Sequence, residues 1–558
     1  MDNNSIADNF SLLAKLMDIH GDNSFKSKSY SVAAFTIEKL PTALTELPAA
    51  KIFSIKGIGD AIGKKIIEQI ETGQLSALNE YLQKTPPGIL EMLAIKGIGP
   101  KKIATIWKEL EIETLGELLY ACNENRLTLY KGFGEKTQQN IKESIEFYMG
   151  SLGSFLYQQI ESYATVIDEK LKKEFALDQF ILTGELRRQL AVIEKIEWVT
   201  TTSLSNLKTF FIANDFIIKE EADSYISFKG KENITVGFFC CDAANIFSKL
   251  FTSSCSETFL SAWKSATNWE AGFSYKTEEE IFFAQKIDFI PPFRRETEKN
   301  IIHEKSGLLT IPIQTNDIKS IIHSHSKWSD GNNTIEEMIV AAIKKGLEYL
   351  VISDHSKSAF YANGLREDRI IAQHQQIDEL NKKYSGFRIF KSIESDILND
   401  GNLDYDDEIL SSFDLIIASI HSNLKMNEEK AMMRLMNAIE NPYTTILGHM
   451  TGRLLLSRNG YPVDHKRIIE ACAANDVVIE LNAHPRRLDI DWRWIDYALE
   501  KNVLISIDPD AHSIEGFDDC RYGVLVAQKT GLIKEKNLSS FSLKEFESFL
   551  VQQHSKRN

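Results

Sequence analysis

Histidine and acidic residues recur at the ends of short apolar runs in the carboxyl-terminal half of this sequence. The segment SIIHSHSKWSDG (320–331) places His323 and His325 one residue apart and Asp330 five residues after the second histidine. Comparable residues follow six further runs, and seven of the chain's twelve histidines lie at such positions. Imidazole and carboxylate groups without thiolates are ligands that Zn²⁺, Mn²⁺ and Fe²⁺ accept. The spacing therefore indicates a metal site rather than scattered polar loop residues.

The apolar runs predict the elements that would position these side chains. They comprise SII before His323 and the segments 349–353, 388–393, 414–420, 444–448, 477–481 and 503–507. Helix-length amphipathic segments, such as 334–346 and 428–440, separate most of them. Alternating strands and helices predict a parallel sheet with right-handed crossovers, and seven repeats predict a closed or nearly closed barrel. Chemistry in such barrels sits at the carboxyl ends of the strands, where these residues fall.

The candidate ligands exceed what one ion needs, so we expect a cluster of two or three divalent ions (Mn²⁺, Zn²⁺ or Fe²⁺). Glu394 and Asp510 could each bridge two ions. Such a cluster lowers the pKa of bound water and clamps both sides of a phosphoryl transfer. The nine candidates are His323, His325, Asp330, His355, Glu394, His421, His449, Asp510 and His512.

Residues 318–530 closely resemble the PHP (polymerase and histidinol phosphatase) domain. The matching motifs are HSHSKWSDG, SDHSKS, YANGL, SIESDILNDGNLDYDD, SIHS, GHMTGRLLLSRNGYPVD, IELNAHPRRLDI and DPDAHS. The resemblance implies a distorted (β/α)7 barrel with a trinuclear metal site, and all nine candidates match the family's ligand positions. Ile321, Met450 and Pro509 depart from the usual pattern beside those ligands.

Residues 1–150 are helical in pattern and contain an internal repeat. IKGIGDAIGKKI (55–66) and IKGIGPKKIATI (95–106) are nearly identical, and YKGFGEKTQQNI, from Tyr130, is a weaker third copy. Gly-x-Gly at a helix start lets backbone amides approach and hold a phosphate, as in a helix-hairpin-helix DNA-binding motif. The predicted DNA contacts are Gly57, Gly59, Lys65, Gly97, Gly99, Lys101, Gly132 and Gly134, with Lys64 and Lys102 nearby.

Together with NSFKSKSYSVAAFTIEKLP (23–41), this region resembles the amino-terminal DNA-end-binding domain and fingers of family-X DNA polymerases. Lys65 falls where lyase-active relatives carry a Schiff-base lysine. A phosphate contact is the preferred role, because a nucleophilic lysine needs a depressed pKa that the sequence does not reveal.

The middle of the chain departs from that family at its polymerase motif. The segment 182–201 keeps Gly184, Arg187 and Arg188, but Glu185 replaces a phosphate-contacting serine. The three catalytic aspartate positions are occupied by Lys195, Glu197 and Thr235. Polymerases use those carboxylates to hold two Mg²⁺ ions. We therefore expect a degenerate palm without nucleotide addition, although 277–296 still resembles the end of the thumb.

The predicted fold is accordingly multidomain. A helix-hairpin-helix region (1–150) precedes an α+β nucleotidyltransferase-like palm and thumb (151–300), a linker (301–317) and an α/β PHP barrel (318–558).

The composition predicts a cytoplasmic protein without membrane contact. The six cysteines have no framework spacing, no apolar run reaches roughly 20 residues and no secretory signal is visible. The net charge of −15 argues against nonspecific DNA binding through bulk charge. The sequence leaves the oligomeric state open, and a monomer is favoured.

The resemblance implies a metal-dependent DNA phosphodiesterase, a 3′→5′ exonuclease or 3′-end processing enzyme acting on gapped, nicked or 3′-ended DNA during repair. A metal-activated hydroxide would be the nucleophile, with Arg453 and Arg487 as phosphate contacts or, alternatively, rim ion pairs. Three alternatives stay open: a working gap-filling polymerase with a proofreading barrel, a small-molecule phosphatase and a non-catalytic DNA-end scaffold.

Overall fold

The computed structural model describes residues 2–40, 42–95, 97–150, 153–230, 233–270, 273–305 and 311–557. The chain divides into two compact units, Met1–Asn123 with Leu127–Glu146, and Glu124–Arg126 with Phe147–Asn558. None of the helices in these ranges is both long and apolar enough to span a bilayer. Residues 306–310 of the predicted linker lie outside the described residues.

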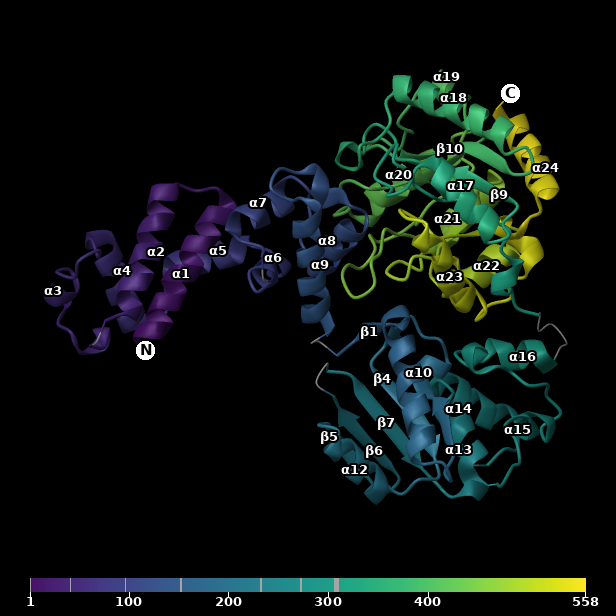
Figure 1. The fold of residues 1–558 in the computed structure, drawn as a ribbon, viewed down its shortest axis with the longest axis horizontal. Coiled ribbons are helices and arrows are strands. Elements are labelled where there is room, and N and C mark those ends of the chain that lie inside the picture. Colours follow the sequence, from purple (N-terminus) through teal and green to yellow (C-terminus); the bar gives the residue numbers. More distant parts are fainter. Residues whose placement is uncertain are drawn as a thin grey trace. The chain divides into compact units, whose positions relative to one another are not determined.

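The first unit is entirely helical in its described part, as predicted (Figure 1). A helical hairpin surrounds each full copy of the repeat, and the third copy precedes a long helix. Apolar repeat residues such as Ile58, Ile98 and Phe133 are buried, which explains why the copies share them. The helices are α1 (Asn3–His20), α2 (Ser24–Glu38), α3 (Ala49–Ile52), α4 (Asp60–Thr72), α5 (Ser76–Lys84), α6 (Pro87–Met92), α7 (Pro100–Lys108), α8 (Leu115–Asn123) and α9 (Glu135–Gly150).

The second unit begins with a five-stranded mixed sheet in the order β2-β4-β7-β6-β5. Its strands are β2 (Phe180–Thr183), β4 (Lys195–Thr200), β5 (Ile217–Ala222), β6 (Tyr225–Lys229) and β7 (Thr235–Cys240). Alternation in the strands buries Trp198, Phe228 and Phe238 on one face, where α10 (Tyr157–Glu174) and α12 (Leu204–Ala213) contribute to the same core. Lys195, Glu197 and Thr235 alternate with these residues and lie on the other face.

A second aromatic core follows this sheet in the chain. It is built from α13 (Ile246–Ser253), α14 (Glu257–Ala266), α15 (Glu279–Phe283) and α16 (Lys299–Lys305). Phe251, Trp263 and Phe282 form its centre. The buried guanidinium of Arg294 then donates to the carbonyl oxygens of Gln528 and Thr530, at 3.0 and 2.7 Å. These bonds tie the segment around Arg294 to the carboxyl-terminal part of the unit.

The predicted parallel barrel is confirmed. Seven parallel strands lie in sequential order: β8 (Ser320–Ile321), β9 (Tyr349–Ile352), β10 (Arg388–Asp396), β11 (Leu415–Ser419), β12 (Ile446–Leu447), β13 (Val478–Asn482) and β14 (Ile505–Asp508). A parallel bridge between Ser324 and Ala511 brings the two ends of the sheet together. The sheet is therefore nearly closed.

Helices connect these strands and lie around their outside (Figure 1). Every residue of β9, β11 and β13 is buried, so these strands are the continuous apolar runs that the sequence displays. The helices are α17 (Ile335–Lys344), α18 (Glu367–Lys383), α19 (Asp407–Leu410), α20 (Glu428–Glu440), α21 (His465–Ala474), α22 (Ile495–Glu500), α23 (Cys520–Ala527) and α24 (Leu543–His554).

Candidate metal centre and DNA-binding hairpins

The ends of the barrel strands carry the candidate ligands into one buried region. His355 follows β9, Glu394 lies within β10, His421 follows β11 and His449 follows β12. After β14 the backbone of Asp510 adopts φ +52°, a left-handed conformation that Asp tolerates better than most residues. All nine candidates are buried or nearly so. The geometry therefore collects side chains that are up to 190 residues apart in the sequence.

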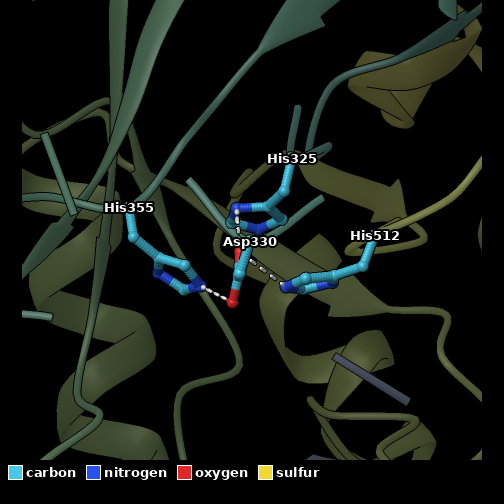
Figure 2. Close-up of side chains that lie close together, drawn as sticks. All are labelled: His325, Asp330, His355 and His512. Carbon is cyan, nitrogen blue, oxygen red and sulfur yellow. Dashed lines mark ion pairs between the residues drawn. The ribbon is translucent and has the colours of Figure 1, made fainter. Parts of the chain in front are cut away.

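Eight of the nine candidates fall into three groups whose ligand atoms lie within 4.8 Å of one another. The groups share members, so the three positions adjoin. They are His325–Asp330–His355–His512, His323–His325–Glu394–Asp510 and His355–Glu394–His421. Figure 2 shows the first group, with His355 and His512 on two sides of Asp330. Their Nε2 atoms lie 3.6 and 3.4 Å from the two Asp330 carboxylate oxygens.

Glu394 is the centre of the remaining contacts. Its Oε2 lies 2.9 Å from His355 Nδ1, and its Oε1 lies 3.1 Å from His421 Nε2. The ninth candidate, His449, joins here as well, with Nε2 2.9 Å from Glu394 Oε1. Glu394 belongs to two of the three groups, so its carboxylate would serve two metal positions. Asp510 Oδ1 lies 3.1 Å from His325 Nε2 and can serve a neighbouring position.

The residues fit a metal cluster because many of their polar atoms are buried and make no well-formed hydrogen bond, although several lie near an oppositely charged group. Such atoms are rare in folded proteins and call for an explanation. They are His323 Nε2, His325 Nδ1, Asp330 Oδ2, His355 Nδ1 and Nε2, Glu394 Oε2, His449 Nδ1 and His512 Nε2. Imidazole and carboxylate donors together suit Zn²⁺, Mn²⁺ or Fe²⁺, and no thiol belongs to the set. The identity of each ligand stays a prediction.

The electrostatics of the centre also favour bound cations. Burial by itself would lower the pKa of His421, but Glu394 and Asp396 outweigh burial and raise it to about 10. Asp330 similarly overcomes burial and raises the pKa of His512 to about 10. Burial and the neighbouring His512 lower the pKa of His325 to about 3. The neighbouring carboxylates therefore favour the protonated, positively charged forms of His421 and His512. Bound divalent cations would supply this positive charge in place of the protons.

Several buried carboxylates orient the ligands from behind, and sequence reasoning did not assign them this role. Glu480 on β13 lies 2.6 Å from His323 Nδ1 and accepts a hydrogen bond from the His449 amide. Asp396 lies beside His421 Nδ1 in the same way. Such partners fix which ring nitrogen faces the metal. The available sequence signal was a glutamate inside the apolar run VVIEL (477–481).

The two arginines proposed as phosphate contacts occupy different positions. Arg453 donates to Asp491 at 2.6 Å and to the carbonyl oxygen of Arg487 at 2.9 Å. The guanidinium of Arg453 is thus bound to other residues of the barrel, which agrees with the predicted alternative of a rim ion pair. Arg487 is buried, with Nε 3.6 Å from Asp510 Oδ2. Only Arg487 stands at the edge of the ligand cluster.

The predicted DNA contacts of the amino-terminal unit have the geometry of phosphate-binding turns. Gly57, Gly97 and Gly132 all adopt φ between +93° and +95°, so the weaker third copy has the same turn as the first two. Gly59 and Gly99 are the N-cap residues of α4 and α7. The first amides of a helix have no intrahelical acceptor, so they are suited to anion binding. Lys101 is exposed, and Lys65 lies half-buried on α4.

Of the three predicted palm positions, Lys195, Glu197 and Thr235, only one carries a carboxylate. Lys195 and Thr235 are direct partners in the β4–β7 ladder, and Tyr225 donates to Glu197 at 3.1 Å. Burial raises the pKa of Glu197, which disfavours its charged form. The two retained arginines are bound within the protein. Arg187 forms a bidentate pair with Glu278 at 2.7 and 3.0 Å, and Arg188 pairs with Glu296 at 3.0 Å.

Comparison with known proteins places the chain in a family. Family models match a "Helix-hairpin-helix domain" at residues 1–75, a "SAM-like Helix-hairpin-helix tandem" at 89–146 and a "PHP domain" at 322–484. The "DNA polymerase/3'-5' exonuclease PolX" of Bacillus subtilis is 32% identical over 559 residues, covering 96% of this chain and 97% of that protein. The chain therefore belongs to the family-X DNA polymerases that carry a PHP domain. This membership makes it a DNA-binding member of an enzyme family.

Other relatives match only part of this chain. A "Probable phosphatase" of Caldanaerobacter subterraneus is 30% identical over 165 residues, covering 29% of this chain and 60% of that protein. A "Probable phosphatase" of Shewanella loihica is 24% identical over 169 residues, covering 29% and 62%. Part of the chain is thus similar to proteins named as probable phosphatases.

Proposed function

We propose that this protein is a metal-dependent DNA phosphodiesterase that removes nucleotides from 3′ ends and has lost nucleotide addition. The observation that carries the proposal is the buried set of three adjoining ligand groups at the strand ends of the PHP barrel. Helix-hairpin-helix turns in the same chain supply a means of holding DNA. The full-length relative named for 3′–5′ exonuclease activity supports the polarity.

Each part of the barrel has a defined role in this proposal. The nine candidates would hold two or three divalent ions, which supply an activated water and neutralise charge on the phosphate. Glu480 keeps a proton on His323 Nδ1, so that the Nε2 lone pair faces the centre. Arg487 would contact a non-bridging phosphate oxygen from the edge of the cluster. Burial excludes bulk water from all of these groups.

Loss of polymerase activity is supported by the palm face. Two-metal nucleotide addition needs carboxylates that face the incoming triphosphate. Here a lysine and a threonine lie at two of the three positions, and the third holds a glutamate bonded to Tyr225. Arg187 and Arg188, bound to Glu278 and Glu296, are not available to a nucleotide in this arrangement.

The test of the proposed activity is release of nucleotides from labelled DNA. Purified protein with Mn²⁺ should release mononucleotides from a 3′-labelled duplex end, and excess chelator should stop the release. Asp510→Asn should reduce the rate by at least about a hundredfold, because it removes a ligand charge. Asp518→Asn, a substitution at an exposed aspartate that pairs with Lys345, serves as the matched control. Unchanged release by Asp510→Asn would refute the assignment.

The similarity to phosphatases favours a second candidate, removal of terminal phosphate groups. A primer that carries a 3′-phosphate separates the two reactions. Loss of the phosphate without shortening of the primer would identify a phosphomonoesterase. Progressive shortening would identify the exonuclease.

A further inference from the structure

The palm face contains a lysine-lined cavity that the proposed function does not use. Its volume is about 220 Å³, and it is lined by Gly153, Ser154, Glu194, Lys195, Lys219, Lys229, Asn233 and Thr235. The cavity is smaller than a typical drug-sized ligand site, which starts near 300 Å³. It has room for a small anion of about the size of phosphate or pyrophosphate.

The sheet itself arranges the lysines around this cavity. Lys195 on β4 pairs with Thr235 on β7, and Thr235 pairs with Lys229 on β6. Residues directly opposite one another share a face, so the two lysine side chains flank Thr235 on one side of the sheet. Lys219, from edge strand β5, reaches the same row and donates to Thr235 Oγ1 at 3.2 Å. Three lysines from three strands thus line the cavity together with one threonine.

Neighbouring acidic groups do not neutralise this row. Glu194 also lines the cavity, and Glu220 lies 3.8 Å from Lys195 Nζ at an exposed position. Glu185 accepts hydrogen bonds from the amides of Glu194 and Lys195, and Glu197 accepts one from Tyr225. Lys229 has no ion-pair partner among the residues that the structure describes. The lining therefore keeps an excess of positive charge.

We propose that this cavity binds a phosphate group directly through Lys195, Lys219 and Lys229, without a metal ion. Lysine ammonium groups and the Thr235 hydroxyl are suitable donors to phosphate oxygens. The positions that would hold metal-binding aspartates in an active palm would then bind the anion by direct charge pairing. The phosphate could belong to a nucleotide or to DNA. The inference does not depend on the activity of the barrel.

Isothermal titration of the full chain with inorganic pyrophosphate tests the proposal. Excess chelator is present, so that no metal ion can bridge pyrophosphate to the barrel. Binding to one site is expected, and the Lys195→Ala/Lys219→Ala/Lys229→Ala variant should bind at least about tenfold more weakly. A Lys170→Ala/Lys173→Ala/Lys264→Ala variant is the charge-matched control, because these lysines are exposed on α10 and α14, outside the cavity. Equal binding by both triple variants, or binding that requires a divalent ion, would overturn the proposal.

A single substitution guards against misfolding of the triple variant. Lys229→Gln removes the charge but keeps a polar side chain, and it should also weaken pyrophosphate binding, while its melting temperature stays at that of the parent. Competition then identifies the source of the phosphate. Displacement of pyrophosphate by dATP indicates a nucleotide, and displacement by a 5′-phosphorylated oligonucleotide indicates DNA. If neither competes, the cavity is not a site for phosphate esters.

Discussion

At the scale of single residues, the barrel depends on buried acids that are not themselves candidate ligands. Glu480 is fully buried on β13 and contacts both the His323 ring and the His449 amide. Burial raises the pKa of Glu480, and the His323 ring beside it acts in the opposite direction. The contact with the histidine offsets the cost of burying this acid, since a buried carboxylate without a partner would be costly.

Glu480→Gln should therefore weaken metal binding without removing a ligand. The amide keeps the shape of the side chain but loses the charge that holds the His323 proton, and such substitutions typically cost about 10–100-fold in metal affinity. Competition of Mn²⁺ or Zn²⁺ with a fluorescent chelator measures the change. Glu440→Gln, at the exposed end of α20, should have no effect. Equal affinities of the two variants would exclude an orienting role for Glu480.

His374 predicts a dependence of stability on pH. Burial, and then the neighbouring Lys391, lower its pKa to about 4, and its Nε2 is buried without a hydrogen bond. A histidine that is neutral in the fold takes up its proton more readily when unfolded. The pKa of His374 is near 6.5 in the unfolded chain. Protonation of His374 therefore does not reduce the free energy of unfolding above pH 6.5, and reduces it increasingly as pH falls toward 4.

His374→Phe should lose less stability than the parent between pH 6.5 and pH 4. The phenyl ring can keep the edge contact with Phe413, 4.8 Å between ring centres, but it cannot take up a proton. Melting temperatures across this range provide the measurement. Parallel pH profiles of parent and variant would show that His374 does not titrate as described.

At the scale of elements, the hairpin turns and the strand ends place function on short loops. The two kinds of site differ in what they require. The barrel needs side chains of fixed type, whereas the hairpins need a backbone that can approach a phosphate. Gly99 shows this clearly, because its φ is −93° and a Cβ there would meet nothing within 4 Å.

Gly99→Ala should weaken binding to DNA ends severalfold with little change in stability. The added methyl group meets open space in the free protein but lies where a phosphate would approach the α7 amides. Fluorescence anisotropy with a labelled DNA end measures the affinity. Gly73→Ala is the control with the opposite expectation. Gly73 ends α4 at φ +72°, so an alanine there should lower stability without affecting DNA binding. If both variants bind DNA like the parent, the α7 turn is not a contact.

At the scale of the whole molecule, the fold class could be predicted from patterns that are visible in a single sequence. Seven apolar runs predicted seven parallel strands, and the nine ligand candidates could be placed because each lies in the segment that follows such a run. Glu480 was missed as an orienting residue because a single buried charge inside a strand does not reveal its partner. Similarly, the internal pairing of Arg187 with Glu278 joins residues 91 positions apart and has no local signal.

The lysine cavity shows the same limit. The sequence indicated that Lys195 occupies the position of a metal ligand. Lys219 and Lys229 could be assigned to the same site only from their positions in the sheet. Strand order and register, which decide which side chains meet, depend on long-range pairing that periodicity does not encode.

The central claim is that the barrel, and not the palm, carries the chemistry. The most direct test follows a 5′-labelled primer annealed to a longer template, with Mn²⁺ and all four deoxynucleotides present. The parent protein and the Lys195→Ala/Lys219→Ala/Lys229→Ala variant should shorten the primer, and Asp510→Asn should leave its length unchanged. Lengthening of the primer by Asp510→Asn would show a working polymerase and contradict the account.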